Sequence, residues 1–165
     1  MTTNRQLTNE QEVLHYLQDE MVTRAEQLVI DLRLPKGDGL SKGRTQASKA
    51  LEVAQTAGSL KVFVNWLRYQ AGRERSAEFW SRQAGKEPSL ARALTIELGN
   101  LQQRIQQVWG TADDQQRNAA VMQAAQRFMG YFRRALIGAE YLDQGMLTGK
   151  KGIAWRSGIP LQAGW

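Results

Sequence analysis

Apolar residues recur at helical spacing along almost the whole of this chain. They return every three or four residues, and no long stretch alternates apolar with polar side chains as a half-buried strand does. Only three prolines interrupt the pattern. We therefore expect an all-α fold, a five-helix antiparallel bundle over residues 1–145. The glycine-containing, basic segment 146–165 is expected to be an irregular C-terminal tail and not a separate domain.

Short polar residues and glycines mark the ends of the predicted helices. The predicted N-caps of the first, second and last helices are Thr8, Ser41 and Thr111. The last helix is predicted to run to about Leu142. The third is predicted over 60–86 and the fourth from Pro88 to about Gly110. The residues predicted to face inward are Leu14, Leu17, Met21, Leu28 and Leu32 on the first helix, and Ala47, Ala50, Leu51 and Ala54 on the second. On the fourth helix they are Leu90, Leu94, Leu98, Leu101, Ile105 and Val108. On the last helix they are Val121, Ala125, Phe128, Phe132, Ala135, Leu136 and Ala139.

The third predicted helix carries a row of cations opposite an apolar face. Lys61, Arg68, Arg75 and Arg82 are seven residues apart, so on one helix they lie nearly above one another, at intervals of roughly 10.5 Å. A repeating row of cations suits a repeating polyanion such as nucleic acid, and a solvated helix face is the alternative. The face predicted to be buried comprises Val62, Trp66, Tyr69, Ala77 and Trp80.

Two further groups of cations are candidate nucleic-acid contacts. Lys42, Arg44 and Lys49 follow the flexible loop around Gly37, where the alternative is a soluble loop. The other group lies on one edge of the last helix, where the alternative is a rim of long side chains around the core. It consists of Arg127 and Arg134, with the ring of Tyr141 at the same heptad spacing.

Arg73 is expected to have a different role. It falls within the predicted apolar face of the third helix, near Tyr69 and Trp80. A buried guanidinium needs a carboxylate, carbonyl oxygens or an aromatic ring as its partner. We therefore expect Arg73 to be structural, with direct ligand contact as the alternative.

The charges are unevenly distributed in this chain of net charge +6. Residues 1–35 contain three arginines against six acids, and residues 36–86 contain ten cations against four acids. Unlike patches on one molecule favour oriented, head-to-tail contacts with neighbouring copies. The absence of cysteine excludes disulfides and thiolate metal sites, and we expect neither a membrane span nor a signal peptide, hence a cytoplasmic protein.

Residues suited to catalysis are scarce. His15 is the only histidine, and no nucleophile with a paired base can be built around it. We expect neither enzyme activity nor a cofactor or metal.

The segment from Leu60 to Arg73, with its Tyr69, Ala71, Gly72 and Arg73, resembles the central helix of the small subunits of type III CRISPR effector complexes. The segments 41–55 and 126–142 are similar to the basic helix that precedes it and to the closing aromatic helix of that family. The resemblance covers about 110 residues in the family's order.

This resemblance implies a non-catalytic subunit that stacks along the filament of an RNA-guided complex and braces the duplex of guide RNA and target RNA. The implied partners are those two RNAs, neighbouring copies of the chain, and the backbone and large subunits. Trp155 and Trp165 are candidate contacts with a neighbour, or else they pack on their own bundle. The alternative function is a helical adaptor whose basic face binds an acidic protein.

Overall fold

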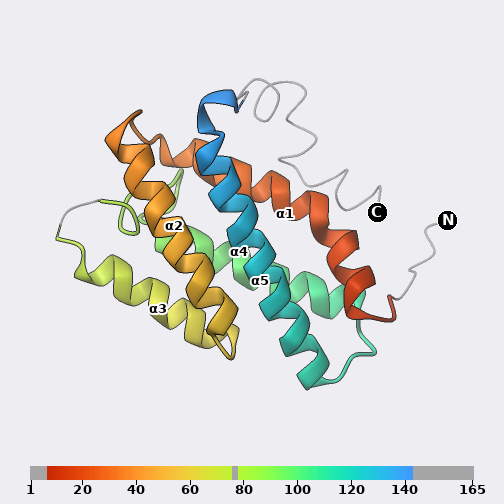
Figure 1. The fold of residues 1–165 in the computed structure, drawn as a ribbon. Helices are drawn as coiled ribbons and strands as arrows, with labels where there is room; N and C mark the ends of the chain where they lie inside the picture. The colour runs from red at the N-terminus through yellow and green to blue at the C-terminus, as the bar shows by residue number, and fades with distance from the viewer. Residues whose placement is uncertain (1–6, 76–77, 143–165) are drawn as a thin grey trace.

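The computed structural model describes residues 7–75 and 78–142 (Figure 1). The prediction of an all-α five-helix bundle is confirmed, and the described residues form no β-strand. No helix among them is both long and apolar enough to cross a membrane. The predicted tail, with Trp155 and Trp165, lies outside the described residues. The helices are α1 (Glu10–Leu32), α2 (Asp38–Thr56), α3 (Leu60–Arg73), α4 (Leu90–Val108) and α5 (Asp114–Ile137), followed by one 3-10 turn, η1 (Ala139–Tyr141).

Four helices begin at a short polar residue whose side-chain oxygen accepts a backbone N–H of the first turn. The predicted caps Thr8 and Thr111 are wrong, because each lies one or two residues before the observed cap. Thr8 instead donates its hydroxyl to the Glu12 carboxylate at 2.7 Å. The observed caps are Asn9, Ser59, Ser89 and Asp113.

The second helix begins four residues earlier than predicted, because its N-cap is Gly37 instead of Ser41. Gly37 precedes it with φ 81°, a conformation that glycine adopts without strain. Its carbonyl accepts the Ser41 N–H at 3.0 Å, which is the first bond of the helix, and no side chain caps the first turn. A Cβ at Gly39 would lie 2.6 Å from Pro35 Cγ, so glycine lets the loop pack against the helix.

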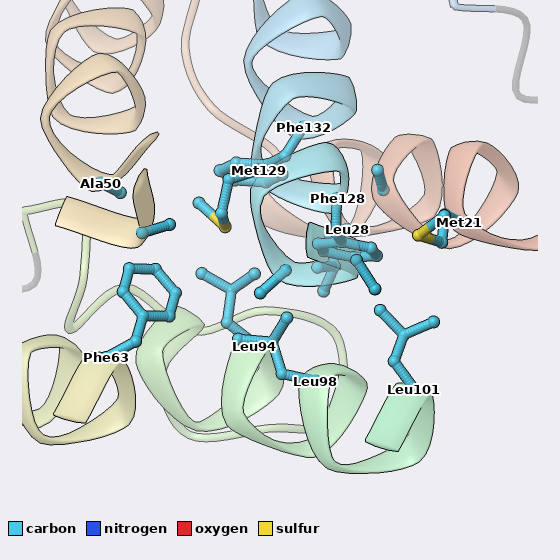
Figure 2. Packing of buried hydrophobic residues seen from close by; sticks show 14 of the residues in the cluster. Met21, Leu28, Ala50, Phe63, Leu94, Leu98, Leu101, Phe128, Met129 and Phe132 are labelled. Carbon is cyan, nitrogen blue, oxygen red and sulfur yellow. The ribbon is translucent and has the colours of Figure 1, made fainter. Parts of the chain in front are cut away.

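α5 lies at the centre of the fold and packs most extensively against α1 and α2. Figure 2 shows side chains from all five helices turned toward one interior, with Phe128 and Phe132 of α5 among them. The three alanines predicted to face inward on α2 are fully buried, which lets α2 lie close to α5. The predicted inward residues are buried except for three that are only partly buried: Leu51, Val108 and Ala139.

The third helix departs most from prediction, because it ends at Arg73 and not at Lys86. The Glu74 carboxylate accepts the backbone N–H groups of Phe79, Trp80 and Ser81 at 3.4, 3.3 and 2.7 Å. These bonds turn the chain back on itself immediately after the helix. The residues 74–89, of which 76 and 77 are not described, therefore form a loop that connects α3 to α4.

This loop is anchored by Trp80, which is fully buried. Its Nε1 donates to Gln46 Oε1 of α2 at 3.0 Å, and its ring meets Trp66 of α3 edge-on at 5.7 Å between centroids. Gly43 of α2 faces the neighbouring Phe79, whose Cε1 would lie 2.9 Å from a Cβ at that position. The loop thus fills the space between α2 and α3.

The predicted apolar face of the third helix is also wrong in part. Val62 and Tyr69 are 55% and 62% exposed, and Ala77 lies outside the described residues. Because the buried side chains come from the opposite side of α3, the helix is rotated relative to the predicted orientation. Its buried residues are Leu60, Phe63, Val64, Leu67 and Gln70.

Candidate nucleic-acid interface

The predicted row of four cations is not a continuous row in the structure. Lys61 and Arg68 are exposed on α3, but Arg75 and Arg82 follow the end of that helix. Arg75 is exposed, whereas Arg82 reaches back to the end of α1. Heptad spacing therefore aligns only the first two of these residues.

Arg82 caps the C-terminus of α1. Its Nε donates to Leu32 O and its Nη2 to Arg33 O, both at 2.8 Å. Arg33 ends α1 in the left-handed conformation, with φ 49°. A cation at this end also interacts favourably with the helix dipole. Arg82 is therefore a structural residue, and no short-range pattern in the sequence indicates this contact across 50 positions.

Arg73 is exposed, so the prediction that its guanidinium is buried is wrong. Its Cζ lies 5.9 Å from the centroid of the Tyr69 ring, one helical turn away. The predicted partner type, an aromatic ring, is present, but the pair lies on the surface. Arg73 therefore belongs with the residues that a ligand can reach.

The outer faces of α2 and α5 form the largest group of predicted contacts. The two helices pack side by side in opposite directions (Figure 1). Asn118, near the start of α5, donates to Gly58 O beyond the end of α2, at 3.3 Å. From 42 to 56, α2 has three cations and one acid, Glu52, and from 118 to 137 α5 has three cations and no acid. We call this surface the basic face; its cations are Lys42, Arg44, Lys49, Arg127, Arg133 and Arg134.

Two arginines lie in the seam between the helices. Arg44 of α2 donates to the carbonyls of Leu136 and Ile137 at the end of α5, at 3.4 and 3.3 Å. Arg133 of α5 donates from Nε to Ser48 Oγ of α2 at 2.8 Å. Both guanidinium groups thus hold the helix pair together through neutral oxygens. Arg133 is absent from the predicted contacts, because its place in the seam depends on how α2 pairs with α5.

The other four cations lie along the two outer edges of the basic face. Lys42 and Lys49 are exposed on α2, about 10.5 Å apart along the helix. Arg134 is exposed and Arg127 half-buried on α5, at the same spacing. Arg134 Cζ lies 5.9 Å from the centroid of the Tyr131 ring. The structure therefore brings five of the predicted contacts to one surface and leaves Lys61 and Arg68 on α3. Tyr141 is not on the α5 edge, because α5 ends at Ile137 and Tyr141 lies in η1.

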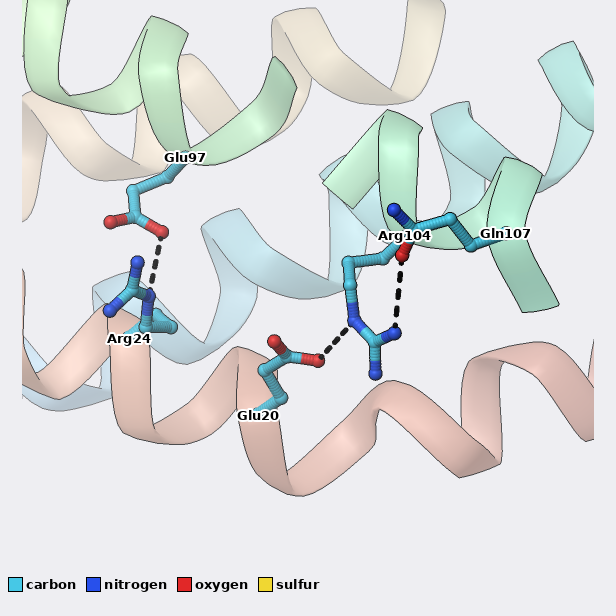
Figure 3. Close-up of polar contacts among 5 residues, drawn as sticks. All are labelled: Glu20, Arg24, Glu97, Arg104 and Gln107. Carbon is cyan, nitrogen blue, oxygen red and sulfur yellow. Dashed lines mark hydrogen bonds and ion pairs between the residues drawn. The ribbon is translucent and has the colours of Figure 1, made fainter. Parts of the chain in front are cut away.

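The acidic helix α1 packs against α5 and α4 on another side of the bundle. Figure 3 shows its contacts with α4: Glu20 pairs with Arg104 at 3.3 Å, and Arg24 with Glu97 at 3.1 Å. Burial raises the pKa of Glu97, although the Arg24 guanidinium acts to lower it. α1 contains six acids and only one cation, so the molecule is acidic where α1 is exposed and basic on α2 and α5.

His15 is exposed on α1. In the described part of the chain, no group of three or more histidines, cysteines or acids is placed to hold a metal ion. Comparison with protein-family models, curated proteins and solved structures finds no match to this chain.

Proposed function

We propose that this protein binds the sugar-phosphate backbone of double-helical RNA with its basic face. One observation carries the proposal: the stretches 42–56 of α2 and 118–137 of α5, which pack side by side, together contain six cations and one acid, Glu52. The two helix axes lie roughly 8–10 Å apart, so the cations form two edges on either side of a central seam. Such a surface can meet several phosphates at once without reading any base.

We further propose that the chain acts as a non-catalytic small subunit of an RNA-guided type III CRISPR interference complex, bracing the duplex of guide and target RNA. The basic face and the sequence resemblance support this role. In such an assembly, affinity comes from backbone contacts and sequence is read by pairing between the two RNAs. A subunit that tolerates every guide sequence must contact phosphates and not bases. The edge residues of the basic face are lysines and arginines, which suit phosphate contacts.

The test is binding of duplex RNA by a variant in which the four edge cations, Lys42, Lys49, Arg127 and Arg134, are replaced by alanine. Arg44 and Arg133 stay, because they join the two helices. Affinity is expected to fall about tenfold or more, and the slope of log K against log salt by about 3–4 units.

A matched control carries the same loss of charge at exposed cations elsewhere: Lys36, Arg75, Lys86 and Arg92, each replaced by alanine. This control should keep most of the duplex affinity. Equal losses in the two variants would mean that only net charge matters and that the basic face is not a binding surface.

The proposed complex is tested by purifying the chain from its host and sequencing the RNA that accompanies it. Short RNAs with common repeat-derived ends are expected. Recovery of an acidic protein that survives nuclease treatment, with no such RNA, would instead support the adaptor function.

A further inference from the structure

Tyr69 is a large aromatic side chain that the core does not use. It is 62% exposed on α3, on the side opposite the buried Phe63 and Leu67. Tyr16 and Tyr131, by contrast, are partly buried and pack against the core. Val62 lies two turns before Tyr69 on the same side and is 55% exposed. α3 thus presents an apolar strip to the surroundings.

The Tyr69 ring is exposed and has a cation and a glycine as its neighbours on the same helix. Gly72 lies three residues after Tyr69, and a Cβ there would meet nothing within 4 Å. Arg73, one turn after Tyr69, places its Cζ 5.9 Å from the ring centroid. Gly72 therefore places no side chain one turn from Tyr69, and Arg73 supplies a cation beside the ring.

The charge of this helix identifies the partner. α3 contains Lys61, Arg68 and Arg73 and no acid. Its surface is therefore more complementary to a polyanion than to a protein partner of average charge. The acid that follows, Glu74, is held by the backbone N–H groups of the 74–89 loop. Aromatic rings set among cations are the usual binding surface for single-stranded nucleic acid, because every base can stack on a ring.

We propose that Tyr69 and Arg73 form a stacking platform for an unpaired base of single-stranded RNA, with Lys61 and Arg68 contacting the adjoining phosphates. This inference rests on the proposed function in that the ligand is RNA. It adds a site on a different helix for a different form of RNA. An RNA that is paired on the basic face and unpaired beyond it would use both.

The experiment measures binding of a single-stranded RNA that contains 2-aminopurine, whose fluorescence falls when the base stacks. Tyr69→Ala is expected to weaken binding by about fivefold to 150-fold and to abolish the quenching. Tyr69→Trp should retain both, while Tyr69→Leu, which keeps an apolar side chain without a ring, should lose both. Tyr141→Ala is the matched control, because Tyr141 is 89% exposed outside α3, and it should bind like wild type.

An abasic oligomer of the same length separates stacking from phosphate contacts. Wild type and Tyr69→Ala should bind it equally, because it offers no base to stack. Wild-type binding of the single-stranded RNA by Tyr69→Ala or Tyr69→Leu would overturn the inference, as would an equal loss on the abasic oligomer. Intact RNA binding with changed self-association in Tyr69→Ala would show that this face contacts protein instead.

The two proposals can fail separately. If the basic-face variant keeps its duplex affinity while Tyr69→Ala loses single-strand binding, the basic-face proposal is wrong and the stacking platform stands. If duplex binding depends on the basic face and single-strand binding does not depend on Tyr69, only the stacking platform is wrong.

Discussion

Replacing Arg82 with alanine should lower the free energy of unfolding, because its guanidinium caps the end of α1. The part-buried bond from Nε to Leu32 O, at 2.8 Å, is a charge-assisted bond and contributes about 1.5–3 kcal/mol. The bond to Arg33 O lies at an exposed position, where water replaces much of its contribution. The helix dipole adds about 0.3–1 kcal/mol. We expect a loss of about 2–4 kcal/mol in total, or about 5–15 °C in the melting temperature.

The assay is thermal and urea unfolding, followed by circular dichroism. Arg75→Ala is the control, since Arg75 is exposed, and it should change the free energy of unfolding by less than about 0.5 kcal/mol. Arg82→Lys keeps the charge but loses the planar fork, and should fall between the two. If Arg82→Ala unfolds like wild type and binds RNA more weakly, the capping role is wrong and Arg82 contacts phosphate, as the heptad spacing predicts.

Two further predictions concern packing and pH. Gly43→Ala should destabilise the fold by about 1–3 kcal/mol, because its Cβ would lie 2.9 Å from Phe79 Cε1. Gly99→Ala, in the open middle of α4, should instead stabilise the fold by about 0.5–1 kcal/mol. Urea unfolding that gave both changes the same sign would contradict this packing. Burial raises the pKa of Glu97, so the folded state binds the proton of this carboxyl more tightly than the unfolded state does. The stability of wild type relative to Glu97→Gln should therefore fall as the pH rises from the ordinary carboxyl pKa through the raised one. A difference that grew with pH would mean instead that the Arg24 ion pair dominates.

Local patterns were enough to predict most of the fold. The inward faces of α1, α4 and α5 follow from apolar spacing, because each is a long helix with one wide buried side. Their ends were less accurate, since several short polar residues stand near each start. Asn9 and Thr8, for example, both suit a cap, and only the geometry decides between them.

The end of α3 could not be predicted in this way. Ala77 and Trp80 continue the helical spacing of apolar residues, so periodicity favours one long helix. What ends it is the capture of three backbone N–H groups by one carboxylate, that of Glu74. One long helix would also align Arg82 with the exposed cations, whereas in the structure Arg82 caps the end of α1.

The basic face was predicted as separate groups of residues and not as one surface. Lys42, Lys49 and Arg134 were identified as candidate contacts by charge and spacing alone. Their common surface depends on the pairing of α2 with α5, whose bonds join residues such as Ser48 and Arg133, 85 positions apart. Spacing within one helix carries no information about such a pairing.

The central place of α5 sets an order of events during synthesis. α1 has a largely apolar buried side that packs mainly against α5, yet α5 ends at Ile137, 105 positions after the end of α1. At usual elongation rates, the ribosome needs roughly 5–20 s to make that stretch. During this interval the apolar side of α1 lacks its main packing partner. The chain therefore completes its fold only after nearly all of the described residues have left the ribosome, and a stop codon before α5 would leave a product that cannot form this core.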